Sequence, residues 1–244
     1  MIAVSKWRKL EGGHIREWHR TVKDGGAKAA VFGISDGLVT NVSLIVGMVG
    51  AHPVAAIVRL AGLAGLVAGA CSMAIGEYIS TQAQKELLQK EIELERLEIE
   101  QYPEEELREL IDTYRNRGLP SDLAHEVATV MMGSDDMALE THVREELGLD
   151  SGQLGNPLLA AAASFGSFAL GAVVPLLPWF VTQGFQAVLI TIVLAIVMAV
   201  AVGAALAGFT GRSLLRSVAR QVILSVVATG IAFGVGSIIG KTGR

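Results

Sequence analysis

The chain has 244 residues, of which 51% are hydrophobic and 18% charged, and its mean hydropathy is +0.48. So apolar a composition excludes an ordinary soluble domain of this length, and a single cysteine, Cys71, excludes a disulfide within one chain. The formal net charge of −4 hides an asymmetry, because residues 81–150 carry 19 of the 24 acidic residues but 7 of the 20 basic ones. We therefore expect two environments, a lipid bilayer and water, for different parts of the chain.

Residues 1–26 form a polar arm that is rich in Lys and Arg. No short apolar run precedes a small-residue cleavage site, so the arm does not resemble a cleaved signal peptide. A basic arm is typical of a nucleic-acid-binding tail or of a segment that flanks a membrane on its cytosolic side. Since a long apolar segment follows at once, we predict a cytosolic arm and no nucleic-acid partner.

Five segments are long and apolar enough to cross a bilayer, which takes about 20 residues in a helix. They lie at residues 27–51, 53–80, 158–180, 185–209 and 217–239. His52-Pro53 separates the first two and predicts a tight turn between antiparallel helices. The predicted fold class is therefore all-α: a polytopic membrane protein with five transmembrane helices and a helical insert between the second and third spans.

Basic residues predict the orientation of these spans, because short loops rich in Lys and Arg stay on the cytosolic side. The chain carries seven basic residues up to Lys28, and the fourth-to-fifth connection carries Arg212, Arg216 and Arg220. The first-to-second and third-to-fourth connections carry none, apart from Arg59 one or two turns into the second span. We expect the N-terminus and the insert in the cytosol and the C-terminus outside.

Small residues recur along two of the spans. The stripes are Gly62, Gly65, Gly69, Ser72 and Gly76 in the second span, and Gly230, Gly234, Gly236 and Gly240 in the fifth. Such stripes let helix backbones approach closely, either within one chain or between two copies. We expect a homodimer, the simplest closed oligomer.

The first span contains a carboxylate, Asp36, about nine residues from its cytosolic end. A charge at the bilayer centre costs about 2.5–3.5 kcal/mol on insertion scales, so Asp36 predicts a function. Thr40 and Ser43 follow on the same helix face. In the second span, which runs the opposite way, we expect Met73 at a similar depth and Glu77 one turn nearer the cytosol. Met73 alone suits packing, but a thioether beside carboxylates favours a transition metal over Mg²⁺ or Ca²⁺.

The insert is predicted to be helical throughout. We expect one helix over residues 82–101, continuous with the second span, and others over 103–117 and 121–132 and from about 134. Pro103 suits the first turn of its helix, and Ser121 or Asp122 is expected to cap the next one.

Nine of residues 91–110 are glutamates. Two groups share a helix face: Glu91 with Glu95 and Glu98, and Glu106 with Glu109. Carboxylates crowded in this way repel unless they are protonated or bridged by cations. The run indicates either a solvated acidic face or a site for divalent metals. His125 and His142 could add nitrogen ligands, but we expect both at the surface.

Several segments resemble the vacuolar iron transporter family. Residues 35–40 (SDGLVT) and 65–80 (GLVAGACSMAIGEYIS) are similar to the signatures of its first two spans. Residues 93–98 (ELERLE), 102–107 (YPEEEL) and 144–148 (REELG) are similar to its insert. The likeness covers nearly the whole chain from about Gly26.

The resemblance implies a dimeric, proton-coupled antiporter, not an enzyme, that moves Fe²⁺ and often Mn²⁺ out of the cytosol. The path residues of the family correspond here to Asp36 and Met73. Its paired metal-binding glutamates correspond to Glu95, Glu98, Glu106 and Glu109, and a later insert helix offers Met131, Met132, Asp136 and Glu140. An acidic residue that some members have midway along the second span has no counterpart near Gly65, which leaves proton coupling open.

We therefore predict a transporter of Fe²⁺ or Mn²⁺ without a prosthetic group, whose partners are the metal ion, protons, the lipid bilayer and a second copy. Its expected parts are a cytosolic arm (1–26), two spans (27–80), a cytosolic acidic metal-binding domain (81–156) and three spans (157–244). The expected site is a prokaryotic plasma membrane, or a vacuolar or other organellar membrane in a eukaryote. In the predicted mechanism the insert concentrates the ion, and Glu77, Met73 and Asp36 receive it.

Two alternatives remain open. The first is a membrane-anchored metal sensor or scaffold without transport, which has no need of Asp36 inside a span. The second is a di-iron oxidase that uses the glutamate-rich helices. Ferritin-like di-iron sites take Glu-x-x-His pairs, and the sequence contains one such pair, Glu11 and His14.

Overall fold

The computed structural model describes residues 25–146, 148 and 155–242, so the predicted arm over residues 1–26 lies almost wholly outside the described residues. Within the described part of the chain, every regular element is a helix, as predicted. These helices are α1 (Gly25–Gly50), α2 (Ala55–Gln101), α3 (Pro103–Asn116), α4 (Ser121–Met131), α5 (Asp135–Glu145), α6 (Pro157–Leu176), α7 (Pro178–Val181), α8 (Gly184–Thr210) and α9 (Leu214–Thr242).

Five of these helices, α1, α2, α6, α8 and α9, are long and apolar enough to cross a membrane, which confirms the five predicted spans. The third span is shorter than expected, because α6 ends at Leu176 and the short helix α7 follows. Pro178 has no amide hydrogen and cannot continue α6. At this break Thr191 donates a hydrogen bond of 3.0 Å to the Pro175 carbonyl and accepts one of 3.1 Å from the Trp179 indole.

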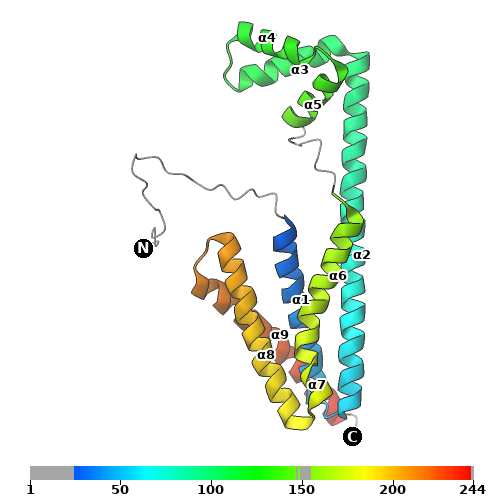
Figure 1. The fold of residues 1–244 in the computed structure, drawn as a ribbon, viewed down its shortest axis with the longest axis vertical. Coiled ribbons are helices and arrows are strands. Elements are labelled where there is room, and N and C mark those ends of the chain that lie inside the picture. The colour runs from blue at the N-terminus through cyan, green and yellow to red at the C-terminus, as the bar shows by residue number, and fades with distance from the viewer. Residues whose placement is uncertain (1–24, 147, 149–154, 243–244) are drawn as a thin grey trace, which may run out of the picture.

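Helix α2 is continuous over 47 residues, as the sequence predicted, and is therefore about 70 Å long at 1.5 Å per residue. Figure 1 shows it along one edge of the molecule, from the transmembrane helices at the bottom to the top, where α3, α4 and α5 gather around its upper end. We call α1, α6, α7, α8, α9 and α2 up to residue 80 the bundle, and residues 91–146 the head. One helix thus belongs to both parts.

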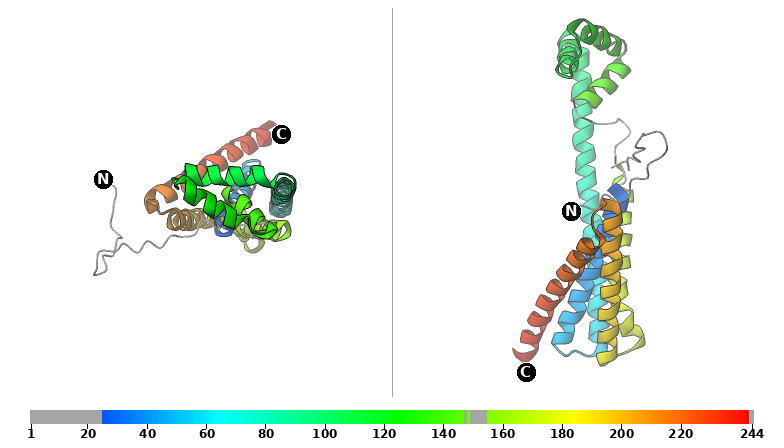
Figure 2. Two further views of the ribbon diagram at one scale, coloured as in Figure 1. Left: turned by 90° about the horizontal axis from the view of Figure 1, so that it is seen from above. Right: turned by 90° about the vertical axis from the view of Figure 1, so that its left-hand side faces the viewer.

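Glycines bring α1 into close contact with its neighbours in the bundle. On α1, Gly37 lies against the backbone of Phe168 in α6, and Gly171 of α6 lies against the backbone of Ile34, so that a Cβ atom at either glycine would collide with a carbonyl oxygen. Helix α9 packs against α1 and α8 and tilts out of the bundle towards its C-terminal end (Figure 2). Helix α1 therefore lies at the centre of the bundle.

The glycine stripe of the second span is used for packing within the chain. Gly62 faces Leu176, Gly65 faces Leu44 and Gly69 faces Phe168. These contacts agree with one of the two uses that the sequence left open, so this stripe does not argue for a homodimer. In contrast, Gly76, Gly230 and Gly234 have open space where a Cβ would lie.

One turn and two helix starts follow local chemistry. His52 has a φ of 57° in the turn between α1 and α2, and Pro103 begins α3 as predicted. Ser134 caps α5 by accepting a hydrogen bond of 3.4 Å from the Met137 amide. The prediction that Ser121 or Asp122 caps α4 is wrong, because both residues lie inside the helix and no side chain caps it.

Candidate metal centre

The last helix of the insert folds back against the upper part of α2, and this places its C-terminal end inside the head. Ala138 and Val143 on α5 are buried, as are Ala124 and Ala128 on α4. An ion pair between Arg117 and Glu145 joins the C-terminal end of α3 to the end of α5. These contacts fix the position of His142, another buried residue of α5.

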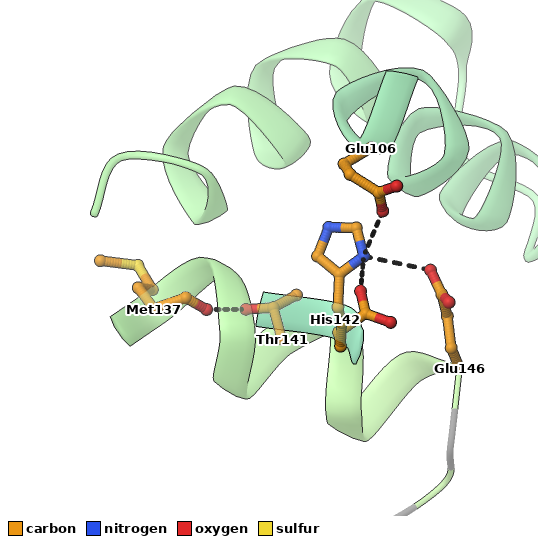
Figure 3. A network of polar contacts seen from close by, with 6 residues as sticks. Glu106, Met137, Thr141, His142 and Glu146 are labelled. Atoms are coloured by element: carbon orange, nitrogen blue, oxygen red, sulfur yellow. Dashed lines mark hydrogen bonds and ion pairs between the residues drawn. The ribbon is translucent and has the colours of Figure 1, made fainter. Parts of the chain in front are cut away.

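Four potential ligands meet in the head, each offering one atom, and these atoms all lie within 4.8 Å of one another. Figure 3 shows three carboxylates converging on the imidazole of His142. The Nδ1 atom lies 3.0 Å from a Glu95 oxygen, 3.5 Å from a Glu106 oxygen and 3.1 Å from a Glu146 oxygen. Glu95 comes from α2, Glu106 from the first turn of α3, and His142 and Glu146 from α5 and its end.

This centre crowds three carboxylates around one buried imidazole. The side chain of His142 is 0% exposed and those of Glu95 and Glu106 are 7% and 10% exposed. One proton on Nδ1 cannot bridge three carboxylates, and Oε1 of Glu95 is buried with Nδ1, 3.0 Å away, as its close polar neighbour. Buried carboxylates are stable when they are protonated, paired or bound to a metal. Three carboxylate oxygens and one imidazole nitrogen form a suitable ligand set for a divalent transition metal.

The electrostatics of the cluster also favour a bound cation. Burial and the charge of Glu95 raise the pKa of Glu106 to about 7. Burial and Glu95 likewise raise the pKa of Glu146. Burial lowers the pKa of His142, but its hydrogen bonds to Glu95 and Glu146 more than offset this, and the net shift is upward. Glu106 is therefore partly protonated near neutral pH when no metal is bound, and a metal ion competes with this proton.

The structure brings two of the eight predicted metal ligands, Glu95 and Glu106, into this centre. Glu109 is exposed, but its charge contributes to the raised pKa values of Glu106 and Glu146. The other candidates are placed as follows: Glu98 is exposed, Glu91 and Met132 are half-buried, Glu140 pairs with Arg144 at 2.7 Å, and Asp136 lines a cavity of about 170 Å³. Metal binding by these six remains a prediction.

The sequence analysis missed two members of the centre. The expectation that His142 lies at the surface is wrong, because α5 packs over it, whereas His125 is exposed as expected. Glu146 was not predicted as a ligand, although it lies in the motif at residues 144–148. The available signal was the spacing of His142 and Glu146 at i and i+4, which places two ligand types on one helix face.

In the bundle, the predicted path residues lie on different faces. Asp36 and Thr40 are exposed on α1. Met73 is half-buried, packs against the cluster of Ala70, Phe168 and Ala172, and has its terminal methyl group beside Gly33. Its methyl group therefore lies about one helical turn from the level of Asp36.

The remaining path candidates are partly covered. Glu77 is half-buried on α2, one turn beyond Met73. Ser43 is half-buried, and its hydroxyl lies 3.4 Å from that of Thr229 on α9. The roles of all five residues in transport remain predictions.

Comparison with known proteins agrees with the resemblance seen in the sequence. A sequence model of the VIT family matches residues 27–237. A vacuolar iron transporter of Acanthamoeba castellanii is 39% identical over 153 residues, which are 63% of this chain and 55% of that protein. One of Toxoplasma gondii is 32% identical over 71% of this chain and 58% of its own, and vacuolar iron transporter 2 of Oryza sativa is 31% identical over 67% of each. The chain thus matches less than two thirds of the length of the first two relatives.

Proposed function

The chain belongs to the VIT family, that of the vacuolar iron transporters, and we propose that it exports Fe²⁺ or Mn²⁺ from the cytosol in exchange for protons. The names of the relatives support iron as cargo, and five apolar helices make the chain an integral membrane protein. Proton exchange and manganese as a second cargo rest on the family resemblance.

The head centre carries this proposal. Glu95, Glu106 and His142 are buried and form a ligand set with the exposed Glu146, and Glu95 lies on the same helix that enters the bundle. We propose that the head captures the ion on the cytosolic side. The basic residues that flank α1, α8 and α9 support this side by the positive-inside rule. On the basis of the same positive-inside rule, we propose that residues 1–26 and 81–156 lie in the cytosol and that residues 27–80 and 157–244 contain the membrane spans.

The exposure of Asp36 supports a homodimer. In a single chain this carboxylate and Thr40 would face lipid, where a charge costs about 2.5–3.5 kcal/mol on insertion scales. A second copy packed across a twofold axis would remove both α1 faces from lipid and bring two Asp36 carboxylates towards a shared path. In this arrangement Met73 and Glu77 lie behind the path on α2, at its cytosolic half.

Transport fits these residues better than either alternative. A di-iron oxidase takes two Glu-x-x-His pairs in one bundle, but the centre in the described part of the chain contains one histidine. The other pair, Glu11 and His14, lies outside the described residues. A sensor or scaffold would need the head centre but has no use for an ionisable residue on a transmembrane face.

Metal flux into proteoliposomes tests the proposal. Purified protein is reconstituted, and Fe²⁺ or Mn²⁺ uptake is measured with and without an acidic lumen, for wild type and Asp36→Asn. We expect flux that needs both the gradient and Asp36. Asp122→Asn, an exposed carboxylate on α4, serves as the control and should transport like wild type. Metal binding without flux under any gradient would favour the sensor or scaffold.

A further inference from the structure

The head centre differs from a purely acidic site in one ligand. Three of its four members are carboxylates, which suit Mg²⁺, Ca²⁺ and Mn²⁺ as well as Fe²⁺. The fourth, His142, offers an imidazole nitrogen, which suits Fe²⁺, Ni²⁺, Cu²⁺ and Zn²⁺. The choice among divalent cations therefore depends on whether this nitrogen coordinates the ion.

The geometry leaves Nδ1 little freedom to withdraw from a bound ion. This atom lies 3.0–3.5 Å from oxygens of all three glutamates, on the side where a shared cation would sit (Figure 3). The ring is completely buried, and α5 is tied to α3 through Arg117 and Glu145. The Glu95 oxygen nearest to Nδ1, Oε1, is itself buried and makes no hydrogen bond of good geometry within the described part of the chain, so it is available to a cation at this place. A cation between the glutamates must then meet the imidazole as well.

We propose that His142 sets the metal selectivity of the head, so that it captures Fe²⁺ in preference to Mn²⁺ and rejects Mg²⁺ and Ca²⁺. The inference rests on the proposed function, because it says which metal ion the head captures for transport. A nitrogen ligand strengthens binding along the series from Mn²⁺ through Fe²⁺ to Co²⁺ and beyond, whereas Mg²⁺ and Ca²⁺ gain little from it. In this proposal the neutral imidazole coordinates the metal ion through Nδ1, and its proton lies on Nε2.

Metal titration of the whole protein in detergent tests this role. Calorimetry gives the affinities for Co²⁺, as an air-stable substitute for Fe²⁺, and for Mn²⁺, with Mg²⁺ and Ca²⁺ as competitors. In His142→Gln we expect the Co²⁺ affinity to fall roughly 10- to 100-fold, as for the loss of a metal-supporting group. The Mn²⁺ affinity should fall by no more than about threefold, because Mn²⁺ accepts oxygen ligands well. His142→Glu should narrow the preference for Co²⁺ over Mg²⁺ as well.

His125→Gln is the matched control, because His125 is an exposed histidine of the same head and should leave every affinity unchanged. A second measurement needs no variant: pulsed electron paramagnetic resonance of Mn²⁺-loaded wild type should detect coupling to one imidazole nitrogen. This signal keeps the test valid if His142→Gln fails to fold.

Two results would overturn the inference. One is an unchanged ratio of Co²⁺ to Mn²⁺ affinity in folded His142→Gln, and the other is the absence of nitrogen coupling in metal-loaded wild type. Flux separates this failure from that of the proposed function. If Asp36-dependent flux persists while the ratio of Co²⁺ to Mn²⁺ affinity is unchanged in His142→Gln, the proposed transport is supported and the selectivity role of His142 is wrong. If the wild-type protein shows no metal flux, the proposed transport function is wrong, whichever metals the head binds.

Discussion

The bundle and the head place their charged residues in opposite ways. In the bundle, α1 packs through glycines at its centre and leaves Asp36 exposed at the periphery. In the head, the carboxylates of Glu95 and Glu106 are buried at the centre, and arginines such as Arg108 and Arg115 lie outside. The ligands of the head centre therefore all come from one chain, whereas the polar face of the bundle is covered by a second copy in the proposed homodimer. Five predictions test this difference.

The largest effect is expected from a disulfide between two copies at the exposed face of α1. In a Cys71→Ser background, Thr40→Cys should cross-link nearly all of the protein in membranes under mild oxidation, because two α1 faces meet across the twofold axis. Non-reducing gel electrophoresis measures the dimer fraction. Ala169→Cys, on α6 and half-buried within the chain, should stay monomeric. Equal cross-linking of Thr40→Cys and Ala169→Cys would contradict the proposal that the exposed face of α1 meets a second copy.

Glu106→Gln should weaken metal binding by the head without blocking the path. Loss of one ligand is expected to lower the affinity roughly 10- to 100-fold. Flux should fall at low metal concentration and recover at saturating concentration, because Asp36 is intact. Calorimetry and proteoliposome uptake measure the two quantities, with the exposed neighbour Glu105→Gln as control. Flux that stays low at saturating metal would show that the head and the bundle act as one site.

Metal affinity of the head should decrease as the pH falls from 8 to 6. The pKa of Glu106 is about 7 and that of Glu146 is raised, so metal must displace protons below these values. Each displaced proton lowers the affinity by up to about tenfold per pH unit. Titrations at three pH values measure this, and in Glu106→Gln the slope should become shallower.

The same groups predict the stability of the metal-free head. A carboxyl group whose pKa is higher in the folded state stabilises that state below the folded pKa, and this contribution is lost as the pH rises through it. For Glu106 the window runs from its ordinary pKa of 4.5 to about 7. The metal-free protein should therefore unfold more easily at pH 8 than at pH 6, and metal should restore stability most at pH 8. Thermal unfolding with and without Mn²⁺ measures both.

The smallest effect should follow from Gly37→Ala in the bundle. Its Cβ would meet the Phe168 carbonyl, and overpacking of this kind typically costs about 1–3 kcal/mol. The melting temperature in detergent should fall while Co²⁺ binding by the head stays unchanged. Gly166→Ala on α6, with open space at its Cβ, should leave the melting temperature unchanged or raise it. A change in head affinity would indicate coupling between the two regions.

The helices could be predicted because their signals are local. Apolar length gives the five spans, and Pro103 marks the start of α3 without any knowledge of packing. The absence of glycine and proline over residues 82–101 likewise predicted that α2 continues beyond the membrane. The largest error in a span boundary is the end of the third span, which was predicted at residue 180, whereas α6 ends at Leu176 before Pro178.

The centre could be predicted only in part, because it depends on tertiary folding. The acidic run indicated Glu95 and Glu106, but it gave no reason to separate them from Glu98, which is exposed. The sequence could not separate His142 from His125, because His142 becomes buried beside the glutamates only when α5 folds back on α2, a contact between residues nearly fifty positions apart. Likewise, the depth of Asp36 follows from its sequence position, whereas its exposure depends on how α6 and α9 surround α1.

The length of α2 sets the distance between capture and entry. Glu95 lies 22 residues beyond Met73 on one straight helix, or about 33 Å away. An ion leaving the head must therefore diffuse to the bundle instead of being passed between touching ligands. Under the proposed function, each captured ion thus returns to solution about 33 Å from Met73 before it enters the bundle.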